Sequence, residues 1–313
     1  MSIVRAPILI APTAFKGTLR APQVAAALAR GFEAGGWPVD PCPVADGGAG
    51  TLEVLLPALG GETSAVTVEG REIGIGLIED GATAIVELCS VLDEASESST
   101  AVGEVLLATA ETGAEVILLA GGDVRAADGG AGAVAALAEA GGIGATVVVL
   151  CDVRTPVDRV AEALAGSGEL ERDAAQELGE RLTALAGTLP RDPRGVTHGG
   201  AGGGLAAALW AACDARLEAG AAFVLGALEF DARMRAARAV IVGEGRLDLG
   251  TLAGKAPGEI ATRARQGGVP CFAAVGTRTL DAFGARILDL QQVLEAGDLP
   301  ALEVAGRRLA TVV

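Results

Sequence analysis

The sequence has no asparagine, no tyrosine and only two lysines, Lys16 and Lys255, among its 313 residues. Aromatic residues make up 3% of the chain, whereas glycine occurs 46 times. This pattern is expected when a GC-rich genome replaces residues with AT-rich codons wherever arginine, alanine or glycine will serve. A lysine that is retained under such pressure is a candidate for a role that arginine cannot fill. Both retained lysines stand beside a glycine.

Positive charge is also scarce, because 24 lysines and arginines face 40 aspartates and glutamates, which gives a formal net charge of −16. A strongly acidic chain repels nucleic acids and anionic membranes at long range. We therefore expect a small-molecule substrate, no nucleic-acid partner and no membrane partner. A bound phosphate would have to be held by a few local cations and backbone dipoles. Whether the chain forms a homodimer is left open by the sequence.

Long apolar runs and paired cysteines are missing from the sequence as well. The apolar run that begins at Leu205 is too short to span a bilayer. The N-terminus passes from Ala6–Ala11 to Pro12 and Lys16 without the apolar core of a signal peptide. The five cysteines are odd in number and lack CxxC spacing, so we expect reduced, buried thiols in a cytoplasmic protein.

What the sequence does contain is an alternation of short aliphatic runs with alanine- and leucine-rich segments of helical length. This alternation is typical of α/β proteins with a largely parallel sheet, and the length suits about two domains of ~150 residues. Residues 66–78 alternate with period two and predict a hairpin that leads into the second domain. Residues 165–195 predict a variable surface segment. The predicted strands are 7–11, 39–44, 84–88, 116–120, 146–151, 239–242 and 271–275, and the predicted helices are 21–34, 51–59, 103–112, 132–140, 173–186, 205–219, 232–237 and 258–266.

One hexapeptide, Ala-Asp-Gly-Gly-Ala-Gly, occurs twice, at Ala45–Gly50 and at Ala127–Gly132. Each copy follows a predicted strand and immediately precedes a predicted helix, whose free N–H groups an anion can approach closely through the glycines. Asp46 and Asp128 could each orient a hydroxyl, accept its proton or hold a metal ion. The alternative interpretation is that both aspartates are ordinary helix caps.

Three other patterns resemble known motifs and fail on context. The segment that starts at Gly130 satisfies GxGxxA, but a charged stretch separates it from its strand, unlike a dinucleotide-binding turn. Gly250–Lys255 is one residue short of a phosphate-binding P-loop and has Ala256 where serine or threonine belongs. His198 is the only histidine, and a lone histidine supports neither a catalytic triad nor a zinc site.

A second candidate constellation follows the predicted strand 239–242. Glu244, Arg246 and Asp248 stand at alternating positions where ligands of open α/β sheets usually bind, and Lys255 follows seven residues later. The two carboxylates can hold Mg²⁺, Arg246 can clamp a phosphate or carboxylate, and Lys255 can add a mobile charge. The alternative is a solvated loop with an internal ion pair of little energetic value.

These patterns belong to a longer series of segments, which are Ala11–Leu19, Pro43–Gly48, Asp128–Gly132, Cys151–Val153, Gly200–Gly204, Gly243–Asp248 and Gly254–Pro257. In this order, and over nearly the whole chain, they resemble the motifs of the bacterial glycerate kinase family. The resemblance implies ATP-dependent phosphorylation of D-glycerate with Mg²⁺. It also implies two α/β domains with the ligand in the cleft: a flavodoxin-like domain built from residues 1–64 and 236–313, and an inserted domain of residues 65–235.

The resemblance and the residue patterns together assign expected roles to a set of residues. One of Asp46 and Asp128 would orient and deprotonate the acceptor hydroxyl. The full expected set is Asp46, Asp128, Lys16 and Arg246 as catalytic residues, Gly47, Gly48, Gly129, Gly130, Gly202, Gly203 and Lys255 as residues that bind the cofactor ATP, and Asp152, Glu244 and Asp248 as magnesium ligands.

The chain departs from the family pattern in several loops. The family usually has Asp-Ser at Thr13-Ala14, Glu at Ala49 and Asn at Thr155, and the Asp123–Ala127 stretch carries an extra residue and lacks the usual Ser, Thr and Asn. A Phe-Gly-Pro-Gln-Lys-Gly segment is missing. Three functions therefore stay open: a kinase for glycerate or a related hydroxy acid, a non-catalytic ligand-binding or regulatory homologue, and a nucleotide-binding oxidoreductase based on GxGxxA.

Overall fold

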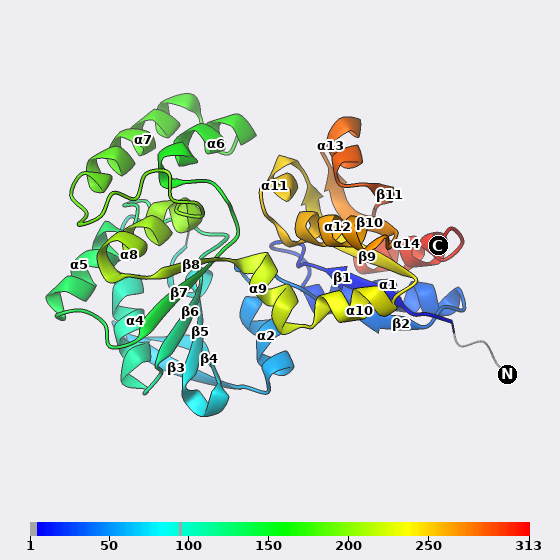
Figure 1. Ribbon diagram of the computed structural model, residues 1–313, viewed down its shortest axis with the longest axis horizontal. Coiled ribbons are helices and arrows are strands. Elements are labelled where there is room, and N and C mark those ends of the chain that lie inside the picture. Colours follow the sequence, from blue (N-terminus) through cyan, green and yellow to red (C-terminus); the bar gives the residue numbers. More distant parts are fainter. Residues whose placement is uncertain (1–4, 94–95) are drawn as a thin grey trace. The chain divides into compact units, whose positions relative to one another are not determined.

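The computed structural model describes residues 5–93 and 96–313 and divides the chain into two compact units (Figure 1). The terminal unit consists of the residues up to Ala45 together with Val224–Val313, and the middle unit consists of Asp46–Phe223. Each unit contains one sheet with helices packed on it. The expected class, α/β with two α/β domains, is confirmed.

The terminal unit is built on a five-stranded, fully parallel sheet with the strand order β11-β10-β9-β1-β2. Numbered along the sheet in chain order, this is the 2-1-3-4-5 arrangement of flavodoxin-like doubly wound folds. The direction of winding reverses between β1 and β9, which pair from Ile8↔Ala239 to Pro12↔Gly243. The strands are β1 (Ile8–Pro12), β2 (Val39–Pro41), β9 (Ala239–Leu247), β10 (Cys271–Arg278) and β11 (Leu290–Glu295).

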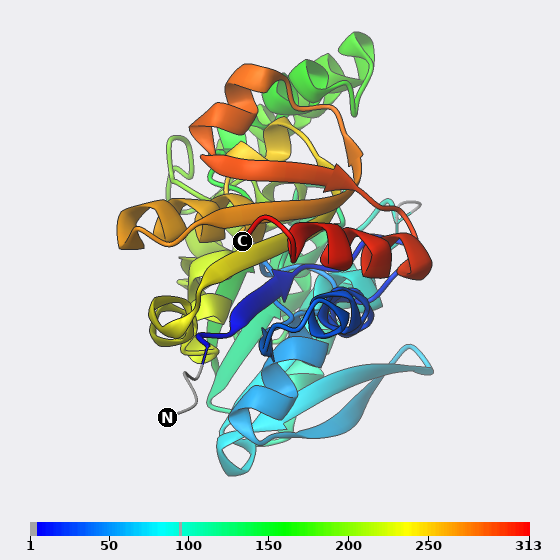
Figure 2. The same cartoon turned by 90° about the vertical axis from the view of Figure 1, so that its right-hand side faces the viewer.

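Helices cover both faces of this sheet. On one face α1 (Ala21–Ala34) and α14 (Leu299–Leu309) lie side by side (Figure 2) and bury Ile8, Ile10 and Phe32 with side chains of the neighbouring strands. The two helices can approach closely because Gly31 has no side chain. A Cβ added there would lie 2.3 Å from the Glu303 carbonyl oxygen. On the other face, α12 (Ala256–Gly267) packs on β9 and β10, and α10 (Phe230–Ala236) contacts α12. The remaining helices of this unit are α11 (Leu249–Leu252) and α13 (Ala282–Ile287).

The middle unit has a six-stranded mixed sheet whose spatial order, β3 to β8, follows the chain. β3 (Glu62–Val68) and β4 (Arg71–Ile78) form the predicted hairpin, joined by Glu69 and Gly70, which both have positive φ. β4 pairs antiparallel with β5, and β5 to β8 are parallel. The other strands are β5 (Thr83–Glu87), β6 (Val116–Ala120), β7 (Thr146–Cys151) and β8 (Arg216–Ala219).

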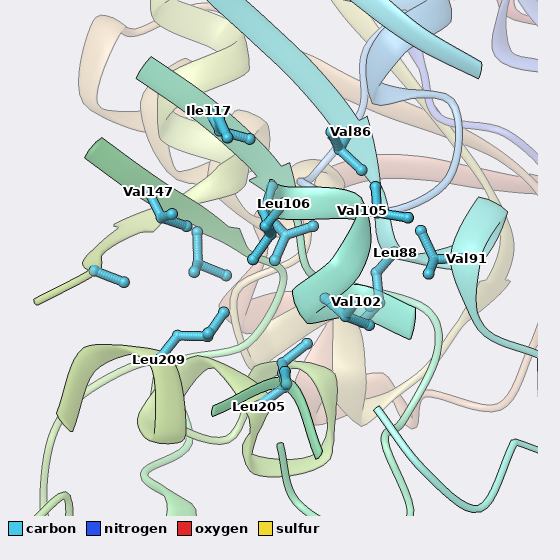
Figure 3. Close-up of a cluster of buried hydrophobic side chains, with 14 of the residues drawn as sticks. Val86, Leu88, Val91, Val102, Val105, Leu106, Ile117, Val147, Leu205 and Leu209 are labelled. Atoms are coloured by element: carbon cyan, nitrogen blue, oxygen red, sulfur yellow. The ribbon is translucent and has the colours of Figure 1, made fainter. Parts of the chain in front are cut away.

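The core of the middle unit lies between one face of this sheet and the helices α3 (Leu88–Val91), α4 (Thr100–Glu111), α5 (Ala131–Glu139) and α8 (Leu205–Cys213). Figure 3 shows Val102, Val105 and Leu106 of α4 packed with Ile117 of β6 and with side chains of β7 and α8. The helix α2 covers the opposite face of the sheet at β4. Its Leu56 side chain packs so closely there that a Cβ added at Gly76 would lie 2.8 Å from it. The helices of this unit are α2 (Thr51–Leu59), α3 (Leu88–Val91), α4 (Thr100–Glu111), α5 (Ala131–Glu139), α6 (Val160–Ser167), α7 (Arg172–Ala186) and α8 (Leu205–Cys213), and α9 (Gly220–Ala227) leads into the terminal unit.

Several predicted boundaries differ from the structure for identifiable reasons. The predicted helix 205–219 ends at Cys213, because Asp214 adopts a left-handed conformation with φ 55°, and β8 follows. The predicted strand 39–44 stops at Pro41, whereas the predicted strand 239–242 continues to Leu247 and includes Glu244 and Arg246. Within the predicted surface segment 165–195, the predicted helix 173–186 is present as α7 and begins one residue earlier, and it packs on α6 through a small apolar cluster.

The unit boundaries also differ from the expected residues 64/65 and 235/236. The first lies after Ala45, because α2 packs on β4 and β5 of the middle unit. The second lies before Val224, because Arg233 of α10 forms an ion pair with Asp40 at 2.6 Å. Among the described residues, no helix is both long and apolar enough to span a membrane.

Candidate active-site loops

The carboxyl ends of β1 and β9 form the topological switch point of the terminal unit, where ligands of doubly wound folds bind. The loop after β1 is tied to β9, because the N–H and hydroxyl of Thr13 donate to the Gly243 carbonyl at 2.8 and 3.0 Å. A Cβ at Gly245 would lie 3.2 Å from the Phe15 Cα and 3.5 Å from the Lys16 nitrogen. The backbone of Lys16 therefore lies against β9 between Glu244 and Arg246, and the lysine side chain is exposed.

Glu244 is a buried carboxylate at this end of β9, with 5% of the residue exposed. It accepts a hydrogen bond from the hydroxyl of Thr251 at 2.7 Å, and Thr251 is itself buried in α11. A buried carboxylate is costly unless it is hydrogen-bonded. This bond also connects β9 to the loop that precedes Lys255.

Arg246, Asp248 and Lys255 gather around Gly250. Asp248 caps α11 by accepting the Gly250 N–H at 2.8 Å, and the Arg246 Nε lies 3.9 Å from the Asp248 carboxylate. A Cβ at Gly250 would lie 3.1 Å from the Lys255 Nζ. Lys255 is the N-cap residue of α12, whose first-turn N–H groups add to the local positive potential. The structure thus brings together Lys16, Glu244, Arg246, Asp248 and Lys255 within the terminal unit.

The first copy of the hexapeptide repeat lies at the carboxyl ends of β5, β6 and β7 in the middle unit. The Ala49 N–H donates to the Asp123 carboxylate at 2.7 Å, and the Leu52 N–H donates to Glu87 at 2.8 Å. The Gly47 carbonyl accepts the Gly122 N–H at 2.9 Å. Two carboxylates from neighbouring strand ends therefore hold the loop that carries Asp46, which is partly buried.

Glu87 and Asp123 were not among the expected site residues. Burial raises the pKa of the Glu87 carboxyl, and hydrogen bonds from the Leu52 and Gly50 N–H groups oppose this increase. A sequence signal exists, because both residues follow the buried runs of β5 and β6 at the edge where Asp46 was expected. Their partners are 35 and 74 residues away in the chain, so the pairings themselves have no local signature.

The second copy adopts a different conformation. Positive φ occurs at Gly47 and Gly50 in the first copy but at Gly129 and Gly130 in the second. Asp128 accepts the Gly130 and Gly132 N–H groups at 3.0 and 2.9 Å, and the Ser99 N–H and hydroxyl at 2.9 and 3.0 Å. Partial burial raises the pKa of Asp128, but these four hydrogen bonds outweigh burial and hold the pKa below its usual value. Asp128 thus links the first turns of α4 and α5.

Most of the expected cofactor-binding glycines are closely surrounded by protein atoms. A Cβ at Gly47 would lie 2.7 Å from the Leu150 carbonyl oxygen, and one at Gly48 would lie 2.3 Å from the Asp123 carboxylate. A Cβ at Gly130 would meet Leu205 and Ala208, so the GxGxxA segment packs against α8. Gly129, Gly202 and Gly203 are likewise buried, and the Gly202 carbonyl accepts the Ala126 N–H.

Asp152, an expected magnesium ligand, follows β7 at the same edge of the middle-unit sheet. Its carboxylate accepts the Asp123 N–H at 3.4 Å, so Asp152 adjoins the residues that hold the first copy. His198 lies beside the segment that follows Asp152, because its Nδ1 is 2.7 Å from the Val153 carbonyl. Over the part of the chain that the structure describes, no three side chains of histidine, cysteine, aspartate or glutamate converge as a metal site.

Comparisons with known proteins agree on one family. The profile of the glycerate kinase family matches residues 8–140 and 143–302. The chain is 31% identical to a glycerate kinase of Halalkalibacterium halodurans, over 97% of each chain, and 30% identical to a glycerate 2-kinase of Escherichia coli K12, over 88% of this chain and 86% of that protein. A crystal structure described as "putative glycerate kinase 2" from Salmonella typhimurium LT2 superposes with a TM-score of 0.73 at 27% identity, over 98% of each chain.

Proposed function

Because the chain belongs to the glycerate kinase family, we propose that it transfers a phosphoryl group from a nucleotide to a hydroxyl of glycerate or a closely related small hydroxy acid. The observation that carries this proposal beyond membership is the cluster of Lys16, Arg246 and Lys255 at the switch point of the terminal unit. On a chain with a net charge of −16, these loops bring together cations and a helix N-terminus, the features that bind phosphates.

We assign the three cations to phosphate or substrate-carboxylate binding. Phosphoryl transfer depends mainly on positioning and on neutralising the charge of the transferred group and its oxygens. Arg246 presents a planar fork suited to two oxygens, whereas Lys255 presents a point charge beside the first turn of α12. Lys16 approaches from the other strand of the switch point, so an anion there can be held from two sides.

ATP with Mg²⁺ is the cofactor pair that this site fits best. Mg²⁺ retains several waters and is usually held by one or two carboxylates together with phosphate oxygens, so it needs no cage of protein ligands. Asp248 and Glu244 supply carboxylates beside the cations of the terminal unit, and Asp152 is a further carboxylate that lies beside Asp123 in the middle unit. Asp248 and Glu244 are the residues that would hold Mg²⁺, which would neutralise part of the charge of the phosphates.

Asp46 is the residue that we assign to orient the acceptor hydroxyl and to accept its proton. A general base needs a carboxylate oxygen that can face the substrate. Both oxygens of Asp128 accept hydrogen bonds from Ser99, Gly130 or Gly132 and so connect α4 to α5, and Asp46 lies in the strand-end loop whose backbone is held by Glu87 and Asp123. Asp128 is then a positioning residue for α4 and α5.

The cytoplasmic location belongs to the same proposal and is supported by five unpaired thiols.

The test is a coupled assay of ADP release with D-glycerate, ATP and Mg²⁺. We expect turnover that depends on all three components and is lost in Asp46→Asn. A folded protein that releases no ADP with glycerate or other small hydroxy acids would overturn the kinase proposal. If Mg-ATP still raised the melting temperature of such a protein, a non-catalytic homologue would replace it, whereas stabilisation by NAD alone would favour the oxidoreductase.

A further inference from the structure

A cavity of about 550 Å³ that is largely open to solvent lies in the middle unit beside the edge strand β8. It is lined by Trp210 of α8, by Asp214 and Arg216 at the start of β8, and by Arg191 and His198 of the segment between α7 and α8. The phosphoryl transfer proposed above assigns no role to any of these residues. The cavity is large enough for a small organic molecule.

The Arg191 guanidinium is fixed in place by three contacts. It lies over the Trp210 ring at 4.1 Å from the centroid, donates to the Trp210 carbonyl, and pairs with Asp214 at 3.1 Å. The Asp214 side chain is 91% exposed, so this ion pair is weak and leaves much of the positive charge available. A guanidinium held in one orientation loses little entropy when it binds a second oxyanion.

Arg216 adds a second positive charge at the same cavity. It is exposed and, within residues 5–93 and 96–313, forms no ion pair with a carboxylate. The charged groups that line the cavity are thus two arginines and one aspartate, with His198 and the Thr197 hydroxyl as further polar groups. On a chain of net charge −16, this surplus of positive charge selects for a small anion.

His198 connects the cavity to the loop that carries Asp152. Its Nδ1 donates to the Val153 carbonyl at 2.7 Å, because a carbonyl can only accept, and its backbone N–H donates to the Arg154 carbonyl at 3.2 Å. The next contact of this segment runs from the Gly200 N–H to the Thr155 carbonyl at 2.8 Å. A ligand that touches His198 therefore acts on residues adjoining Asp152.

We propose that this cavity is an effector site for a small oxyanion, a phosphate- or carboxylate-bearing metabolite, bound by Arg191 and Arg216 and coupled through His198 to the Asp152 loop. Binding at the cavity is independent of the proposed kinase activity. The effect on turnover rests on the proposed function, so the two parts are tested separately.

Binding is tested with inorganic phosphate and with malonate, a plain dicarboxylate. Only Trp37 and Trp210 fluoresce, so a Trp37→Phe protein reports on Trp210 alone, and calorimetry on the unsubstituted protein provides an independent measurement. We expect a saturable change with at least one anion, weakened roughly tenfold or more by Arg216→Gln. Arg172→Gln, an exposed arginine on α7 away from the cavity, is the matched control and should leave the affinity unchanged.

Each outcome of the binding experiment supports or removes the site. Response to phosphate alone identifies a phosphate-bearing ligand, response to malonate alone identifies a carboxylate, and response to both identifies a general oxyanion site. No saturable change with either anion, or equal weakening in Arg216→Gln and Arg172→Gln, overturns the proposal. The cations of the terminal unit can also bind the anion, so some binding heat is expected to remain in Arg216→Gln, and only heat that is undiminished in Arg216→Gln counts against the proposal.

The coupling to turnover is tested in the kinase assay. We expect the anion to change kcat or KM at least twofold in the unsubstituted protein and to have no such effect in Arg216→Gln, whose activity without the anion should be normal. Saturable binding at Trp210 with unchanged kinetic constants would overturn the effector role and leave the binding site. Absence of any kinase activity would count against the proposed function alone, because the fluorescence titration does not depend on it.

Discussion

Lys255 and Lys16 are both cations of the proposed phosphate site, but their surroundings differ. The Lys255 Nζ lies close enough to Gly250 that an added Cβ would be 3.1 Å away, whereas Lys16 is exposed and Gly17 has open space beside it. Arginine keeps the charge and changes the shape. We expect Lys255→Arg to lower kcat/KM at least tenfold, about 1.4 kcal/mol of transition-state stabilisation, and Lys16→Arg to lower it less.

The measurement is steady-state kinetics of both variants beside the parent, with the melting temperature of each as the control for folding. Equal losses in the two variants, or unchanged activity in Lys255→Arg, would contradict the arrangement described around Gly250.

Asp46 and Asp128 occupy the same place in identical hexapeptides and should nevertheless respond oppositely to substitution. Asp128→Asn replaces a charged acceptor of four hydrogen bonds and should cost about 2 kcal/mol in the free energy of unfolding. Asp46→Asn should lower kcat by roughly a hundredfold or more, as expected for loss of a general base, with a smaller loss of stability than Asp128→Asn. Urea unfolding and the ADP-release assay on both variants give the two readouts.

The pH dependence supplies a control for Asp128. Its pKa is lowered in the folded protein, so its contribution to stability is present above the ordinary aspartate pKa of ~3.9 and is lost as the pH falls through the folded-state value. The stability difference between the parent and Asp128→Asn should shrink over that acidic range. A difference that stays constant would show that the loss does not come from the carboxylate charge.

At the scale of elements, Glu87 connects the end of β5 to the first turn of α2. Burial raises the pKa of its carboxyl, so the folded state binds the proton more tightly than the unfolded chain. The free energy of unfolding should therefore fall as the pH rises from the ordinary glutamate value of ~4.3 through the raised pKa. Glu87→Gln cannot titrate at this position and should lack this decrease. Urea unfolding of both proteins from about pH 4 to about pH 7, a range of roughly three units, measures the difference. Parallel pH profiles would contradict the assignment.

Elements with strong local signals were predicted well, and elements that depend on neighbours were not. Helices 21–34 and 51–59 have the predicted bounds, because glycines follow both. β8 and β11 are short edge strands that mix polar and apolar residues and contain no long aliphatic run, so they were missed. The two hexapeptides show the same limit at the site, since Asp123 and Glu87 hold one copy and Ser99 the other.

For the whole molecule, the prediction of two α/β domains followed from alternation along the chain, whereas the unit boundaries depended on packing. No local pattern distinguishes Asp46–Leu59 as part of the middle unit, because its assignment comes from α2 lying on β4 and β5. The two lysines of the site were found from composition, since the chain has no others, and Arg246 was found from its place after the predicted strand 239–242. Thr251, which donates to Glu244, has no comparable signal.

The five unpaired thiols are distributed over both units and can report on each separately. Cys42 and Cys271 are in the terminal unit, and Cys89, Cys151 and Cys213 are in the middle unit. Burial raises the pKa of Cys42 to about 11 and those of Cys89 and Cys271 to about 12, so native thiols should react slowly with alkylating reagents near neutral pH. Alkylation in urea therefore measures unfolding around each cysteine.

Mg-ATP should protect the two units unequally, because we assign phosphate binding to the terminal unit. At a nucleotide concentration of about 100 times Kd, binding adds about 2.7 kcal/mol to the stability of the unit that holds it. We expect Cys42 and Cys271 to require more urea for alkylation with Mg-ATP, and the other three thiols to shift less, as measured by iodoacetamide pulses and mass spectrometry of each cysteine peptide. Equal protection of all five would mean that both units unfold in one transition, and protection of the middle unit alone would place the nucleotide there.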